Sequence, residues 1–120
     1  MTTLRGNTGF DVLGERWIMA RRTSVEDRAL ESCSGYCDFP NSMIVVIKDL
    51  DTSEPDSTKN PEEFYKKVAR HEVVHAFLSE SGLAQSSIGS EAWAMNEEMV
   101  DWIAVQGPKI YKVWQKLGAV

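Results

Sequence analysis

The strongest constraint in this sequence is an uninterrupted helix signal between Asn60 and Gly82. Asn60 can accept a hydrogen bond from a free amide at the helix start, and Pro61 suits the first helical position. Two acidic residues follow in the first turn, where they face the positive end of the helix dipole. Gly82 can adopt the left-handed conformation that commonly ends a helix. We therefore predict a helix over residues 61–81.

Apolar residues occur on opposite sides of this predicted helix. Val73 and Phe77 lie on one side. A stripe on the other side, with spacings of three and four residues, contains Phe64, Val68, His71, His75 and Leu78. Because a helix that is apolar nearly all round is typically buried, we predict that it lies at the centre of the fold.

The part of the chain before this helix has strand signals. The clearest is the apolar, β-branched run MIVVIK at residues 43–48, whose composition suits a strand covered on both faces. Weaker signals cover residues 12–22 and 34–38. Residues 1–11 are mostly polar, and we expect the first of them to be frayed.

Three further helices are expected. A short one over residues 24–31 would begin at a capping box, a second would cover residues 91–106, and a third would begin at Pro108 after Gly107. Strands followed by helices are typical of an α+β fold. We predict a single domain, residues 1–120, in which a small β-sheet packs on the long helix and one or two others.

His71, Glu72 and His75 form an HExxH motif within the long helix. Residues four apart on a helix are neighbours, so both imidazoles can reach one zinc ion at ~2.0–2.1 Å from each nitrogen. The carboxylate of Glu72 can then take a proton from a zinc-activated water molecule as a general base. A chance pair of histidines is the alternative interpretation. Both histidines of the chain lie here on an apolar stripe, where unpaired buried imidazoles are unfavourable, so the motif favours a metal site.

The third zinc ligand must come from outside the motif, because a catalytic zinc usually has three protein ligands. The sequence NEEMVD at residues 96–101 places Glu97 and Glu98 among apolar neighbours on the second predicted helix. Glu97 and Asp101 are four residues apart, so one carboxylate can bind the metal while the other accepts a hydrogen bond from a ligand imidazole. We prefer Glu97 as the ligand and keep Glu98 as the alternative.

HEVVH followed by NEEMVD resembles the HExxH…NExxxD pattern of the gluzincin metallopeptidases. The resemblance implies that Glu97 is the third zinc ligand and that Asp101 orients a ligand histidine. The stretch from Gly35 to Ile110 looks more closely like a group of small metallopeptidases encoded by phages and prophages. That group implies a minimal zincin-like fold and leaves the substrate open.

Substrate contacts are marked less clearly than the metal site. The Tyr or His that usually steadies the oxyanion in gluzincins has no motif in this chain. The candidates are Tyr36, Tyr65, Arg70 and Tyr111. For each of them, a packing or surface role is the simpler interpretation. The strand over residues 43–48 could lie along the cleft and pair with an extended substrate.

Charge and hydropathy exclude some classes of partner. The formal net charge is −5, whereas contact with nucleic-acid phosphates needs clustered Lys and Arg. No apolar run approaches the ~20 residues that span a bilayer, and the start lacks a signal-peptide pattern. We expect no nucleic-acid or membrane partner, a protein or peptide substrate, and a cytoplasmic location, in the bacterial host if a phage encodes the protein.

The function that these features favour is a zinc metallopeptidase, which hydrolyses a peptide bond with zinc-activated water. One alternative is a structural zinc module in which Cys33 and Cys37 join the two histidines, although the gap between the pairs is long for such a site. Another is a phage interaction protein that binds zinc without turnover.

We predict one zinc ion per chain, because both histidines share one helix face. Metal analysis of protein purified without chelator should find a stoichiometric transition metal, although ions other than zinc can occupy such sites. Protein that carries no such metal, and takes up none on dialysis against zinc, would contradict the prediction.

Overall fold

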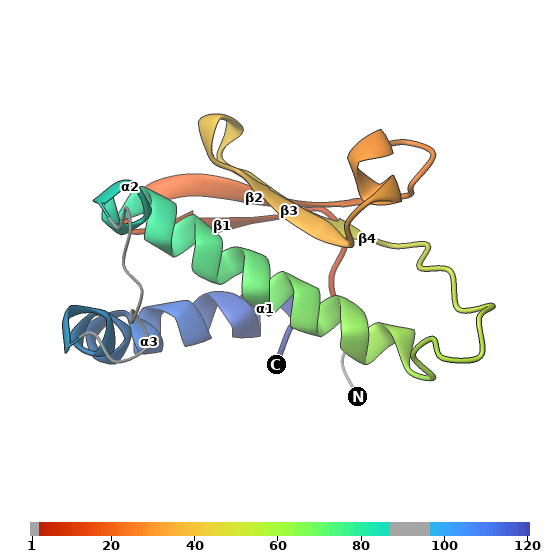
Figure 1. Cartoon of the computed structure of the whole chain (residues 1–120). Coiled ribbons are helices and arrows are strands. Elements are labelled where there is room, and N and C mark those ends of the chain that lie inside the picture. Colours follow the sequence, from red (N-terminus) through yellow and green to blue (C-terminus); the bar gives the residue numbers. More distant parts are fainter. Residues whose placement is uncertain (1–2, 87–96) are drawn as a thin grey trace.

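A computed structural model describes residues 3–86 and 97–120 of the chain. In these residues the strands precede the long helices, as the sequence predicts (Figure 1). The elements are, in order, β1 (Thr8–Val12), β2 (Glu15–Arg22), a 3-10 helix (Arg28–Glu31), β3 (Gly35–Asp38), a second 3-10 helix (Phe39–Asn41), β4 (Met43–Ile47), α1 (Pro61–Glu80), α2 (Leu83–Ser86) and α3 (Glu97–Leu117). The α+β class is therefore confirmed.

The strands form one mixed sheet in the order β1-β2-β4-β3. β1 pairs antiparallel with β2, and β3 pairs antiparallel with β4, while the central strands β2 and β4 run parallel. Every residue of β4 from Ile44 to Ile47 is buried, which confirms that this segment is covered on both faces. β3 lies at one edge of the sheet.

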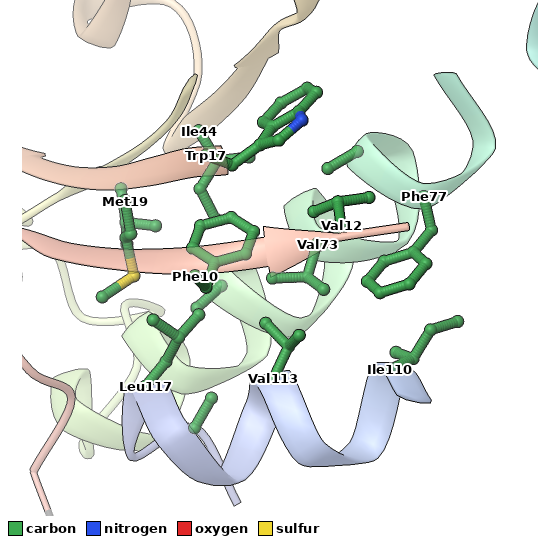
Figure 2. Close-up of a cluster of buried hydrophobic side chains, with 14 of the residues drawn as sticks. Phe10, Val12, Trp17, Met19, Ile44, Val73, Phe77, Ile110, Val113 and Leu117 are labelled. Carbon is green, nitrogen blue, oxygen red and sulfur yellow. The ribbon is translucent and has the colours of Figure 1, made fainter. Parts of the chain in front are cut away.

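Both long helices pack on the same face of the sheet (Figure 1). Alternate residues of the strands point toward them, as strand geometry requires. The resulting core, shown in Figure 2, contains Phe10, Val12, Trp17, Met19 and Ile44 from the sheet, Val73 and Phe77 from α1, and Ile110, Val113 and Leu117 from α3. On the other face a smaller cluster forms around Ala20, Leu30, Val45 and Ile47.

Helix α1 begins and ends where its capping residues predict. The side chain of Asn60 accepts a hydrogen bond from the amide of Glu63 at 3.3 Å, and Pro61 is the first helical residue. Gly82 follows the helix with φ of 82°. The predicted burial holds for only part of the helix. The side that contains Val73 and Phe77 and the flank that contains Glu72 are buried, whereas His71 and His75 on the predicted stripe are exposed.

The start of the chain differs from the prediction. Residues 12–22 were expected to be one strand, but the chain turns at Leu13 and Gly14, with φ of 50° and 91°, so that β1 and β2 form a hairpin. Two-residue hairpin loops with both φ values positive normally contain Asn-Gly or Asp-Gly. Because Leu13 occupies the first position, the sequence does not contain the usual signal for this turn. The sequence of β1 has no clear strand signal of its own, and its pairing with β2 depends on that turn.

The capping box at Thr23 and Glu26 forms without the predicted α-helix over residues 24–31. The Thr23 amide donates to the Glu26 carboxylate at 2.8 Å, and the Glu26 amide donates to the Thr23 hydroxyl at 3.1 Å. The next residue, Asp27, has extended backbone angles and caps the 3-10 helix Arg28–Glu31 instead. Its carboxylate also pairs with Arg22 at 2.9 Å, so contact with the sheet interrupts the helix.

Helix α3 continues through Gly107 and Pro108, where the sequence predicts a break between two helices. A proline inside a helix removes one hydrogen bond and bends the helix. Burial of Ile110, Val113 and Leu117 on the core outweighs this cost. The first residues of the predicted 91–106 helix lie outside the described residues. Of the helices described, none combines the length and the apolar character needed to cross a membrane.

Gly35 of β3 lets the edge of the sheet approach α1 closely. A β-carbon at this position would lie 2.5 Å from a methyl group of Val68 and 2.8 Å from the carbonyl oxygen of Val45. Both distances are far below van der Waals contact, and the second involves backbone that cannot rotate away. Glycine is therefore required where β3 passes the helix that contains the HExxH motif.

We predict that Gly35→Ala lowers the free energy of unfolding by about 1–3 kcal/mol, the usual cost of overpacking a tight contact. Gly6→Ala is the matched control, because a β-carbon there would meet no atom within 4 Å. Urea unfolding of both variants checks the prediction. Equal stability of the two variants would show that β3 does not constrain the helix as described.

Candidate metal centre

His71 and His75 approach each other on successive turns of α1. Their Nε2 atoms are 3.1 Å apart, and their ring centroids are separated by 4.7 Å with an interplanar angle of 70°. Both side chains are exposed. The structure thus brings together the two nitrogens that the sequence predicts as metal ligands, on the side of α1 that the core leaves open.

The nitrogen–nitrogen distance fits a shared tetrahedral zinc ion. Two ligands at ~2.0–2.1 Å from the metal, separated by the tetrahedral angle, lie about 3.3 Å apart, close to the 3.1 Å between these two rings. A hydrogen bond between an N–H and an unprotonated nitrogen has a similar length. Partial desolvation by the surrounding protein, and then the charge of His71, lower the pKa of His75, which favours the neutral imidazole that binds metals.

Glu72 lies on the flank of α1 and is buried, with 7% of its surface exposed. Its side chain lies against β3, since a β-carbon on Gly35 would be 3.5 Å from its Cγ atom. Among the described residues its carboxylate has no hydrogen-bond partner. Burial raises the pKa of Glu72, and the charge of His71 partly opposes that rise. The carboxylate oxygens are not among the fully buried polar atoms that lack a partner, and Glu72 lines a hollow between β3 and α1. A carboxylate with a raised pKa that remains accessible suits a proton acceptor.

A hollow of about 230 Å³ opens between the start of β3 and α1. Ser34 and Gly35 form one side. The other side is formed by five residues of α1, which are Phe64, Lys67, Val68, His71 and Glu72. The predicted base and one predicted metal ligand therefore line the same hollow, which a substrate could enter.

The predicted third ligand lies beyond what the structure describes. Glu97 is the first residue of α3, and Asp101 follows one turn later. The side chains of both lie outside the described residues. Glu98, the alternative ligand, is exposed. Helices α1 and α3 pack against each other, and ligation by Glu97 or Glu98 stays a prediction.

The two cysteines do not join the histidines. Cys33 is exposed, and its thiol donates to the carbonyl of Ala29 at 3.2 Å. Cys37 is half-buried on β3, where burial, and then the charges of Glu72 and Asp38, raise its pKa to about 11. Among the described residues, no three His, Cys, Asp or Glu side chains are grouped so that they could hold a metal ion. A preformed Cys₂His₂ module is therefore absent from this part of the chain.

Three of the four oxyanion candidates have structural partners. Tyr111 on α3 is half-exposed, at 50%. The Tyr36 hydroxyl donates a hydrogen bond to Asp27, and the Tyr65 hydroxyl accepts one from the Leu50 amide at 3.2 Å. The Arg70 guanidinium donates a hydrogen bond to the Ala119 carbonyl at 2.7 Å. Packing roles therefore account for these three.

The strand beside the candidate site is not the one expected. β4 was expected to pair with a substrate, but it lies inside the sheet between β2 and β3. β3 is at the edge, and it approaches the HExxH helix at Gly35. The short run GYCD gave only a weak strand signal, and its edge position depends on the order of the strands.

No protein-family model matches this sequence, and neither curated proteins nor solved structures give a match.

We predict that Glu97→Ala weakens zinc binding far more than Cys33→Ala does. The loss should exceed the ~10–100-fold expected for Asp101→Asn, since a residue that only orients a ligand contributes that much. Competition titrations with a zinc chelator measure all three variants. If Cys33→Ala loses zinc while Glu97→Ala keeps it, the ligand assignment is wrong, and if Glu98→Ala is the damaging change, Glu98 is the ligand.

Proposed function

We propose that this protein is a zinc-dependent peptidase in which His71 and His75 hold the metal and Glu72 is the general base. The observation that carries the proposal is the placement of these three side chains. The two ring nitrogens converge to 3.1 Å, while the adjacent residue Glu72 is 7% exposed and its carboxylate has no hydrogen-bond partner among the described residues.

The proposed metal site would consist of His71, His75 and a carboxylate from the start of α3, with Glu97 preferred. A zinc ion bound in such a site lowers the pKa of a coordinated water molecule to about 7. Two neutral imidazoles and one carboxylate are the ligand set of several catalytic zinc enzymes, so the chemical types of these side chains agree with the proposal.

Glu72 would remove the proton of the attacking water and later deliver it to the leaving amine. A base works best when its pKa approaches the working pH. Burial shifts the pKa of Glu72 upward, in that direction. Because the side chain lies on the flank of α1 rather than on the side of the histidines, it can act on the water without binding the metal.

The edge position of β3 supports a peptide as substrate. An edge strand has unpaired backbone groups that can bond to an extended chain. β3 spans Gly35–Asp38, and at Gly35 it is in contact with the helix that bears the three functional residues. A peptide paired with this edge would pass the hollow that His71 and Glu72 line.

We predict that Glu72→Gln keeps its fold and its zinc but loses peptidase activity by ~10²–10⁴-fold, the usual contribution of a general base. The amide has nearly the size of the carboxylate, so both imidazoles should stay in place. Cleavage of a peptide library at matched zinc loading measures the loss.

Glu63→Gln is the control, because it removes the same charge from an exposed position on the same helix. This variant should cleave like the wild type. Equal rates for Glu72→Gln and the wild type would show that Glu72 is not the base. Stoichiometric zinc without cleavage of any library peptide would instead favour a zinc-binding interaction protein.

A further inference from the structure

The hollow beside Glu72 is placed to receive one side chain of a substrate. Its lining includes both His71 and Glu72, so any group that enters it lies next to the proposed reaction centre. Its volume of about 230 Å³ is below the ~300–1,000 Å³ typical of sites that enclose a small molecule. The size therefore suits a single residue of a longer chain.

The walls of the hollow are apolar and its rim is positively charged. Phe64 and Val68 are half-buried and form the apolar side, and Gly35 faces them across the hollow with no side chain of its own. Among the described residues that line the hollow, Lys67 is the only Lys or Arg. It lies four residues before His71, so its ammonium group is on the helix face that bears the proposed metal ligands.

The charge of Lys67 is available to a ligand. Glu63, four residues earlier, pairs with Lys66 instead, at 3.4 Å. Among the described residues Lys67 has no ion-pair partner, and its side chain is exposed. Since the chain as a whole has a net charge of −5, a cation at this rim is a local feature rather than part of a basic surface.

We propose that this hollow selects an acidic substrate residue, preferably glutamate, next to the bond that is cleaved. The methylene groups of a glutamate would lie against Phe64 and Val68, and its carboxylate would accept a hydrogen bond from the Lys67 ammonium. Among the described residues that line the hollow, Glu72 is the only carboxylate, and it lies eight residues along α1 from Phe64. This proposal rests on the proposed peptidase function, because it assumes that the glutamate lies next to a bond that is cleaved. Binding of a glutamate-containing peptide to the hollow can nevertheless be measured without cleavage.

The test compares the zinc-loaded wild type with Lys67→Glu and Lys67→Met on paired peptides that differ only in a Glu or a Lys at one position. A charge-assisted hydrogen bond predicts a kcat/KM about 10–100-fold higher for the glutamate peptide in the wild type. Lys67→Met should remove this preference, and Lys67→Glu should reverse it, chiefly through KM. Lys112→Glu, an equal charge change at an exposed position of α3, should leave the preference intact.

Binding of the same peptides to zinc-loaded Glu72→Gln, with and without Lys67→Glu, is measured in parallel by calorimetry. Cleavage without a preference for glutamate, or a preference that survives Lys67→Glu, overturns the proposed selection of an acidic residue by the hollow and leaves the peptidase function standing. If no peptide is cleaved, the peptidase function fails. In that case, glutamate-selective binding that Lys67→Glu abolishes still supports the pocket, and unselective or absent binding overturns it.

Discussion

The packing of one face of α1 on the sheet governs the arrangement of the candidate site. Ala69, Val73, Ala76 and Phe77 are all buried, and Figure 2 shows Val73 and Phe77 within the core formed by the sheet and α3. With 3.6 residues per turn, this face fixes the rotation of every other side chain on the helix. Glu72 then lies on the flank beside β3, and the two histidines lie on the exposed side of the helix, opposite the face that packs on the core.

Polar residues of α1 divide into those that join it to other elements and those that do not. Three of the former hold both ends of the chain and the hairpin against the helix. Their bonds run from the Leu4 amide to Glu62, from Arg70 to the Ala119 carbonyl at 2.7 Å, and from the Trp17 indole to Glu80 at 2.9 Å. In the described part of the chain, Lys67 and Glu72 make no such bond. The residues that bond to other elements therefore have a structural role, whereas Lys67 and Glu72 are available to bind or act on a substrate.

The close approach of β3 to α1 connects the fold with the acid–base properties of Glu72. Gly35 allows backbone to pass where any side chain would collide with Val68, and the approach removes water from around the carboxylate. Desolvation disfavours the charged form of an acid, and it is the main cause of the raised pKa of Glu72. The same approach places the half-buried thiol of Cys37 near Glu72, a proximity that the sequence pattern alone did not suggest.

Local interactions made much of this protein predictable from its sequence. Asn60, Pro61 and Gly82 determine the bounds of α1, because capping and backbone preferences act within a few residues. The HExxH spacing likewise determines that His71 and His75 are neighbours. Other features of the fold depend on contacts beyond the local sequence. The Leu13–Gly14 turn depends on pairing between β1 and β2. The continuous helix through Pro108 and the edge position of β3 depend on contacts between distant segments, whose burial outweighs local preference. The sequence by itself thus determined which side chains could bind a metal, and only the tertiary structure decided that the histidines stay open while Glu72 is buried, because helix rotation is set by the core.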